Sequence, residues 1–231
     1  MGRMKTSRSR LREYIEIIVV SFLMAVLVRN YVICGYKVPS GSMEDTLLVG
    51  DHFLACRFYY RFAEPKPGDV IVFQYPLDTD RDFVKRVVAV GGQTIEIRDK
   101  QVLVDGFPIQ RPDDAKHVDE RIYRQGISTR DNYGPMSVPP GYVFVLGDNR
   151  DNSRDSRYWG LLDQRLIKGK AFLLYWSWKR MRDDPQLVQL EDPVLRSLPR
   201  VALSIFRVIV FEITHIPWRV RWNRVGRLIT A

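Results

Sequence analysis

The pattern of apolar residues changes sharply along the chain, and its longest uninterrupted run lies near the N-terminus. Residues 17–28 read IIVVSFLMAVLV, twelve positions without a charge. Residues 31–33 add further apolar positions, so that a helix over 14–34 has the length needed to cross a bilayer. We therefore predict a transmembrane anchor at 14–34. A buried core helix is the alternative, because the apolar run is short.

Beyond residue 35 the apolar positions fall into short runs typical of strands. Clusters of Gly, Pro and Asp separate these runs and favour turns. The pattern predicts a mainly β body over 35–178, with strands at 70–75, 83–90, 94–98, 101–104, 142–146 and 171–178.

Two regions depart from the strand pattern. Residues 111–134 are polar and weakly periodic, which indicates an exposed insertion. In the extension 179–231, apolar residues between Leu195 and Ile213 have helical spacing. Because Arg207 and Glu212 interrupt this segment, we expect a helix on the body or at a lipid surface rather than a second span.

Charge changes the interpretation of the N-terminus. The chain carries a formal net charge of +9, and five basic residues and no acidic one lie in its first twelve positions. No nucleic-acid-binding motif accompanies this charge, so we expect no nucleic-acid partner. The positive-inside rule places the basic tail 1–13 in the cytoplasm and the body outside it. The segment Arg29–Lys37 lacks the A-x-A pattern of a cleaved secretory signal.

Cysteine and histidine point to no metal or cofactor. Cys34 and Cys56 lack the spacing of metal ligands, and we favour two unpaired thiols over a disulfide. The three histidines lie in unrelated contexts.

A serine and a lysine are the first candidates for catalysis. Ser42 lies in the segment PSGSM, at 39–43, and Lys85 lies in FVKRVV, at 83–88. On a strand, Lys85 shares a face with Phe83 and Val87. A lysine held among apolar groups has a lowered pKa, and its neutral amine can take a proton from a serine hydroxyl. A solvated lysine and a simple serine turn are the structural alternatives.

The third informative segment, 147–160, reads GDNRDNSRDSRYWG. Such a dense run of short polar residues is either an elaborate turn or the wall of a site. Together with PSGSM followed by TL, and with FVKRVV, it resembles the signature boxes of bacterial type I signal peptidases, in the order of that family. PGDVIVF at 67–73, DNYGP at 131–135 and RWNRVGRL at 221–228 extend the resemblance.

The resemblance implies a body of antiparallel β-sheets, like that of signal peptidases and repressor proteases, and a serine endopeptidase without cofactors. Ser42 would be the nucleophile and Lys85 the general base. Ser153 would hydrogen-bond Lys85 and orient it, while the Ser40 hydroxyl and the Ser42 backbone N–H would hold the oxyanion.

The resemblance also implies supporting residues. Asp155 and Arg157 would form an ion pair that braces the polar loop, with Asp148 and Arg86 as further supports. Gly147 would allow the backbone to approach Lys85 closely.

By the same resemblance, the partners are the signal peptides of exported preproteins and the phospholipid membrane. Cleavage would take place at the outer face of the plasma membrane. It would follow Ala-x-Ala, because the bulky walls of the substrate pocket exclude side chains larger than alanine. The expected walls are Tyr36, Val38, Pro39, Met43, Leu47, Phe53, Val72, Phe83 and Val84.

Two positions depart from the family pattern. Asp45 replaces a usual proline, and Gly91-Gly92-Gln93 replaces a usual proline-glycine-aspartate turn, so we expect altered loop stiffness. Two rival functions are a self-cleaving Ser–Lys repressor, which would be cytosolic, and a catalytically silent β-domain that binds signal peptides.

Overall fold

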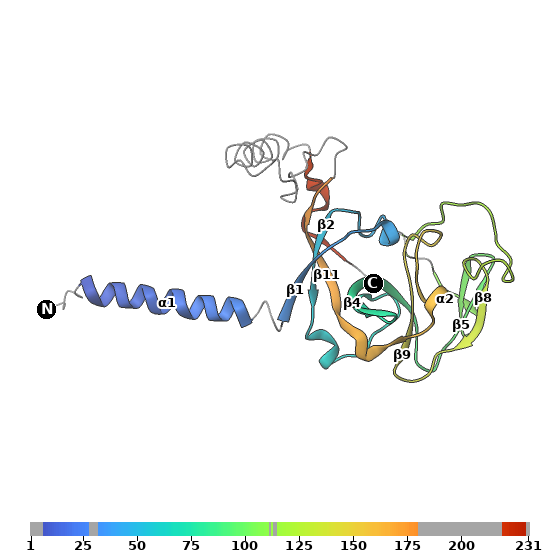
Figure 1. Ribbon diagram of the computed structural model, residues 1–231, viewed down its shortest axis with the longest axis horizontal. Coiled ribbons are helices and arrows are strands. Elements are labelled where there is room, and N and C mark those ends of the chain that lie inside the picture. Colours follow the sequence, from blue (N-terminus) through green and yellow to red (C-terminus); the bar gives the residue numbers. More distant parts are fainter. Residues whose placement is uncertain (1–6, 28–31, 111, 113–114, 180–218, 230–231) are drawn as a thin grey trace, which may run out of the picture.

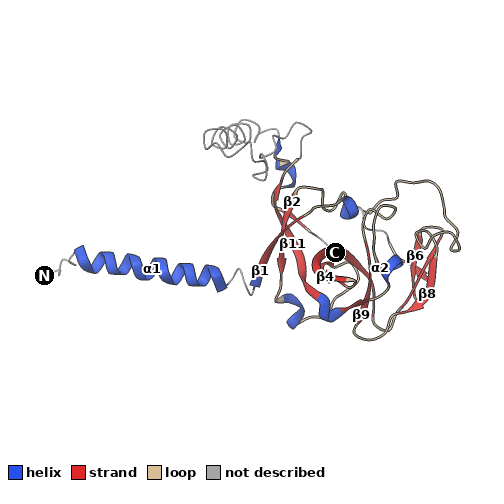
Figure 2. Cartoon of the chain, viewed as in Figure 1, coloured by secondary structure: helices blue, strands red, loops and turns tan. Residues whose placement is uncertain are grey.

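The computed structural model describes residues 7–27, 32–110, 112, 115–179 and 219–229. In the first helix it describes side chains only from residue 13 onward. The predicted helix over 195–213 lies outside the described residues. The chain forms one N-terminal helix and a β-rich body (Figures 1 and 2).

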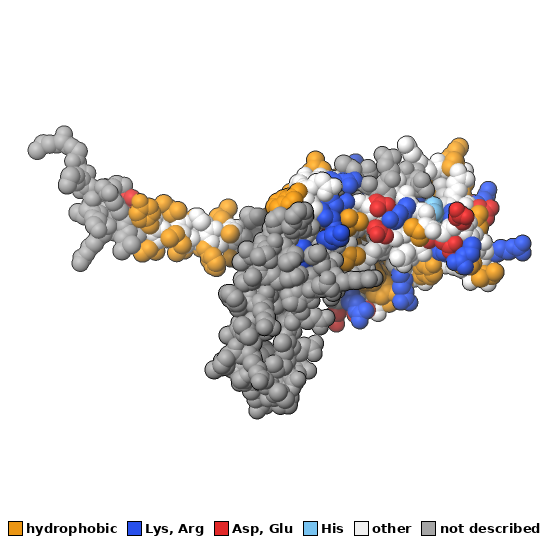
Figure 3. Space-filling view, turned by 90° about the horizontal axis from the view of Figure 1, so that it is seen from above, with side chains coloured by type: hydrophobic (Ala, Val, Ile, Leu, Met, Phe, Trp, Pro, Cys, Tyr) orange, Lys and Arg blue, Asp and Glu red, His pale blue; other side chains and the backbone are white. Residues whose placement is uncertain are grey.

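Helix α1, Ser7–Leu27, extends away from the body (Figure 1). Its side chains from Tyr14 to Leu27 are exposed, and all of them except Glu16 and Ser21 are apolar. Figure 3 shows this hydrophobic surface beside a body on which charged side chains are spread. Over the described part of the chain, no helix combines the length and the apolar character that crossing a membrane requires.

The predicted helix over 14–34 is wrong in its bounds. The observed helix begins seven residues earlier and ends at Leu27, whereas Ile33–Lys37 forms strand β1. Cys34 of β1 lies opposite Ala55 of the antiparallel strand β2, Asp51–Cys56. Backbone pairing with β2 thus overrides the continuous apolar pattern, which does not by itself distinguish helix from strand.

The larger sheet contains eight strands, and it forms the main part of the body (Figure 2). Its order is β1-β2-β11-β3-β4-β9-β10, with β12 paired to β11, and each neighbouring pair is antiparallel. The remaining strands are β3 Val70–Tyr75, β4 Asp78–Val90, β9 Tyr142–Leu146, β10 Leu162–Asp163, β11 Ile167–Ser177 and β12 Arg227–Leu228.

The smaller sheet has four strands in the order β7-β6-β5-β8. They are β5 Thr94–Arg98, β6 Gln101–Val104, β7 Phe107–Pro108 and β8 Tyr133–Ser137. The short helices are α2 Ser156–Trp159 and the 3₁₀ turns η2 Gly41–Met43, η3 Tyr59–Arg61, η4 Gln164–Leu166 and η6 Trp222–Arg224. The mainly β, antiparallel prediction is confirmed.

The polar insertion contains few regular elements. Between residues 115 and 132, the described chain runs as loops and turns until β8 begins at Tyr133. Arg130 pairs with Asp131 at 2.8 Å and with Asp119 at 3.0 Å. Polar contacts therefore order this loop in place of an apolar core.

The C-terminal segment 219–229 returns to the larger sheet through a buried acid. Asp51 is fully buried, and its two oxygens accept from Arg221 at 3.0 Å, Arg224 at 2.7 Å and the Ser177 hydroxyl at 2.6 Å. Arg224 also donates to the carbonyl oxygen of Thr46, four residues after Ser42. One carboxylate thus links the chain end, β2, β11 and the loop that follows Ser42.

We expect Asp51→Asn to lower the free energy of unfolding by about 3–5 kcal/mol, because it leaves two partly buried guanidinium groups without their counter-ion. Urea unfolding in detergent measures this change. Arg98→Gln, which removes an exposed ion pair with Glu96, should leave the unfolding midpoint unchanged. Equal midpoints for Asp51→Asn and the unsubstituted protein would contradict the role given to Asp51.

Candidate active site

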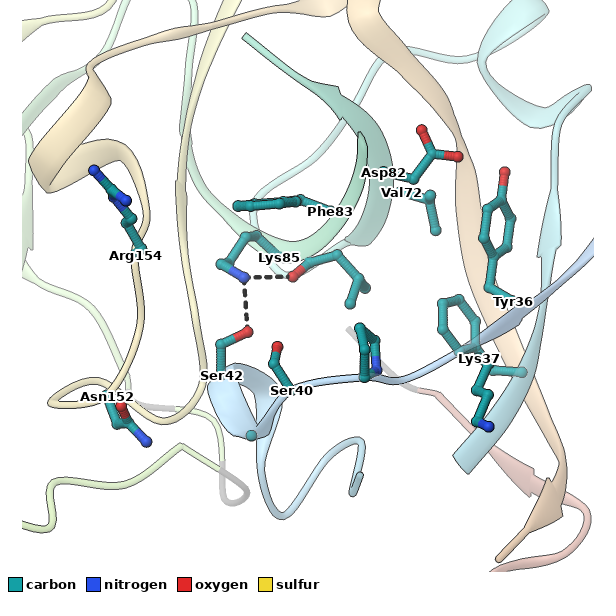
Figure 4. Close-up of a pocket in the computed structure, with 14 residues that line it drawn as sticks. Tyr36, Lys37, Ser40, Ser42, Val72, Asp82, Phe83, Lys85, Asn152 and Arg154 are labelled. Carbon is teal, nitrogen blue, oxygen red and sulfur yellow. Dashed lines mark hydrogen bonds between the residues drawn. The ribbon is translucent and has the colours of Figure 1, made fainter. Parts of the chain in front are cut away.

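Ser42 lies in a tight turn that follows the first strand of the body. Ser40 is extended, with φ −133° and ψ 157°, and the 3₁₀ turn η2 begins at the next residue. Met43 is fully buried and fixes this turn against the core. The Ser42 hydroxyl consequently points into a cleft beside β4 (Figure 4).

Lys85 comes from β4, and its amine meets Ser42 in that cleft. The side chain is only 3% exposed. Its Nζ lies 2.8 Å from Ser42 Oγ and 2.9 Å from the Val84 carbonyl oxygen (Figure 4). Phe83 covers the amine, with its ring centroid 5.4 Å from Nζ. The structure therefore brings together the two residues that the sequence pattern singled out.

Burial lowers the pKa of Lys85 to about 8, against the opposing effect of the Asp155 and Asp148 carboxylates. The cause is desolvation, which disfavours the ammonium form. A lysine with this pKa is neutral in a substantial fraction of molecules near pH 8. The neutral amine can accept the Ser42 proton across the same 2.8 Å.

Ser153 does not make the hydrogen bond expected of it. Its Oγ is buried, yet it has no hydrogen-bond partner within the described structure. Lys85 instead donates to the Val84 carbonyl oxygen. Ser153 packs against Gly147, where an added Cβ would overlap with Ser153 Oγ and lie 2.5 Å from the Ser42 carbonyl oxygen. The close contacts printed at Gly147 are thus with Ser153 and the Ser42 backbone, and its close approach to Lys85 stays a prediction, while the expected Ser153–Lys85 hydrogen bond is wrong for this structure.

Two buried ion pairs brace the loop around the lysine. Arg157 binds Asp155 through Nε and Nη2, both at 2.8 Å, and Asp155 also accepts from the Gly147 backbone N–H at 3.1 Å. Arg86 binds Asp148 through Nε and Nη2, both at 2.9 Å. The expected ion pair between Asp155 and Arg157 is therefore present, and Arg86 and Asp148 form a second one.

The cleft has a volume of about 340 Å³ and contains six of the nine expected wall residues. These six are Tyr36, Pro39, Phe53, Val72, Phe83 and Val84. The other three, Val38, Met43 and Leu47, are wrong as wall residues, because their side chains pack in the core without lining the cleft. Along an extended chain, alternate side chains point to opposite sides, and sequence alone did not reveal which set faced the cleft.

Four polar residues of the cleft went unpredicted: Lys37, Asp82, Asn152 and Arg154. Their positions next to Tyr36, Phe83 and Ser153 in the sequence are the signal that could have identified them. Ser40 also lines the cleft, beside Ser42 (Figure 4). Its part in holding an oxyanion stays a prediction.

Asp45, which departs from the family pattern, adopts φ 82°. Proline, whose ring holds φ near −65°, is excluded from this conformation. Lys116 of the insertion binds Asp45 at 3.1 Å and Glu44 at 3.3 Å. The insertion thus contacts the turn just beyond Ser42 through the ion pairs of Lys116.

The described residues include no group of three or more His, Cys, Asp or Glu side chains arranged to hold a metal ion. Cys34 and Cys56 are not joined in a disulfide. The cleft itself contains a serine hydroxyl beside a desolvated amine, an arrangement suited to nucleophilic catalysis.

Comparison with known proteins identifies the family of this chain. Residues 11–176 match the family described as signal peptidase, peptidase S26. Signal peptidase I of Aquifex aeolicus is 34% identical over 73% of this chain and 85% of its own length. A probable signal peptidase I-1 of Synechocystis is 36% identical over 74% of this chain and 85% of its own length.

A crystal structure of a signal peptidase I from Enterococcus faecalis is also similar, at 26% identity and a TM-score of 0.38. It covers 47% of this chain and 97% of the crystallised one. The family match spans well over half of the chain, and both relatives exceed 30% identity. The chain belongs to the signal peptidase family, peptidase S26, and is a protease of the signal peptidase I type.

Proposed function

We propose that this protease cleaves signal peptides from exported preproteins with Ser42 as nucleophile and Lys85 as general base. The observation that carries the proposal is the 2.8 Å contact between Lys85 Nζ and Ser42 Oγ at a buried lysine. Membership of the signal peptidase family supports the substrate class.

In the proposed reaction, neutral Lys85 takes the Ser42 proton while Oγ bonds to the scissile carbonyl carbon. The carbonyl oxygen becomes an oxyanion, for which the Ser40 hydroxyl and the Ser42 backbone N–H are the proposed donors. Lys85 then gives its proton to the leaving amine, and the C–N bond breaks to leave an ester on Ser42. Water attacks this ester, Lys85 takes a proton from the water, and Ser42 regains its hydroxyl as the acid product leaves.

The apolar end of the cleft supports a preference for small side chains before the cut. Tyr36, Phe53 and Val72 line this end, and Tyr36 and Phe53 stack with ring centroids 5.7 Å apart. Bulky walls of this kind leave little depth, so we propose that alanine is accepted at the first and third positions before the cut and that larger residues are excluded.

We further propose that the protein is anchored in the bacterial plasma membrane by its N-terminal segment, with a cytoplasmic N-terminus and the body on the outer face. The exposed apolar side chains of α1 support this location, because a large apolar helix surface is stable only when it is covered. The five basic residues in the first twelve positions, three of them in the first turns of α1, support the orientation. Anchoring enzyme and preprotein in one membrane raises their effective concentration.

Ser42→Ala and Lys85→Met should each lower kcat by about 10⁴-fold or more, because the two groups act as a unit. The assay is cleavage of a detergent-solubilised preprotein whose signal ends in Ala-x-Ala, with the cut located by mass spectrometry. Lys85→Met keeps the unbranched apolar side chain, so its unfolding midpoint should not fall. Ser137→Ala and Lys66→Met, at exposed positions outside the cleft, should cleave normally. Normal cleavage by either dyad variant would refute the mechanism.

The pH dependence of kcat/KM should follow the neutral fraction of Lys85. Because its pKa is lowered to about 8, activity should rise with pH through about 8 and level off above it. At pH 6 it should be about a hundredfold below the plateau. A profile that is flat from pH 6 to pH 9 would argue against Lys85 as the base.

Gly147→Ala should lower kcat by about a hundredfold, because the added Cβ displaces Ser153 or the Ser42 backbone and a shift of about 1 Å costs that much. Gly126→Ala, where an added Cβ meets nothing within 4 Å, is the control and should leave kcat unchanged. A Gly147→Ala variant with unchanged kcat would show that the close packing is dispensable.

A further inference from the structure

The cleft has two chemically different ends, and the dyad lies between them (Figure 4). Tyr36 and Val72 lie on one side of Ser42 and Lys85, whereas Asn152 and Arg154 lie on the other. If the apolar end takes the residues before the cut, as the proposed function requires, the residues after the cut pass Asn152 and Arg154.

Arg154 differs from the other two arginines of its loop. Arg150 and Arg157 are buried, and Arg157 binds Asp155. Arg154 is exposed, lines the cleft and has no hydrogen bond or ion pair with another described residue. Its planar guanidinium is therefore available to a carboxylate, which it can bind through two parallel hydrogen bonds.

The charges at the other end of the cleft do not offer the same site. Asp82 lies there and is paired with Lys168 at 2.8 Å. Lys37, which also lies there beside Tyr36 (Figure 4), is a flexible cation on the side assigned to residues before the cut. Among the described residues that line the cleft, Arg154 is thus the exposed cation on the side assigned to the side chains after the cut.

We propose that Arg154, assisted by the Asn152 amide, forms a subsite for an acidic side chain within the first three residues after the cut. Preproteins with Asp or Glu there are then cleaved faster than those with Lys or Arg. This inference rests on the proposed function, because it uses the same dyad and the same direction of the bound chain.

The preference should be modest, since Arg154 is exposed and water competes for its charge. A solvent-exposed ion pair changes a rate constant by about two- to fivefold. The effect should shrink as added salt screens the charges.

The test uses the full chain in detergent and a preprotein with an Ala-x-Ala site that carries Glu, Gln or Lys at each of the first three positions after the cut in turn. For the unsubstituted protein, kcat/KM should fall in the order Glu, Gln, Lys at one or more of these positions. Arg154→Gln should flatten the order, and Arg154→Glu should reverse it.

Arg124→Glu makes the same change in net charge at an exposed position outside the cleft, and it should keep the original order. The subsite is refuted if the unsubstituted protein cleaves all three substrates equally, or if Arg154→Glu keeps the original order. Both of those outcomes leave the proposed function intact. Failure of the unsubstituted protein to cleave any of the substrates would instead overturn the proposed function, and the subsite with it.

Discussion

The desolvation of one amine is the constraint on which the site depends. Lys85 must reach Ser42 while its ammonium form is kept out of water, and β4 achieves this by placing it among Phe83, Val84 and the strands on either side. In water the same amine would be protonated at neutral pH and unable to accept a proton. The burial that lowers its pKa therefore also suits it to the role of base proposed for it.

The nearby carboxylates oppose the lowering of the Lys85 pKa without reversing it. Asp148 and Asp155 raise the pKa of Lys85, yet each carboxylate is held by its own arginine in a buried two-bond pair. A lone carboxylate so near the amine would stabilise its charged form more strongly. The ion pairs thus hold the loop 147–157 in place and moderate its field at the amine.

Many strands of the body could be predicted from the alternation of apolar and polar residues and from the turn residues between them. The strands at 70–75, 94–98, 101–104 and 142–146 occur with the predicted bounds, because each lies between clear turn signals. β1 was missed because its apolar residues continue the hydrophobic run of α1. β2 was missed because Asp51, which begins it, is a buried acid whose arginine partners come from residues 221–224.

The sequence by itself determined the candidate residues: a serine in SGSM, a lysine on an alternating strand and a polar loop rich in Asp, Arg and Ser. Residue type and local spacing are sufficient to identify these candidate residues, because each motif lies within a single segment of the chain. Only the tertiary structure decided which residues face the cleft, where Arg154 lies relative to the dyad, and that Ser153 packs against Gly147 without bonding Lys85. These depend on side-chain directions and on contacts between segments distant in the chain, which local patterns do not encode.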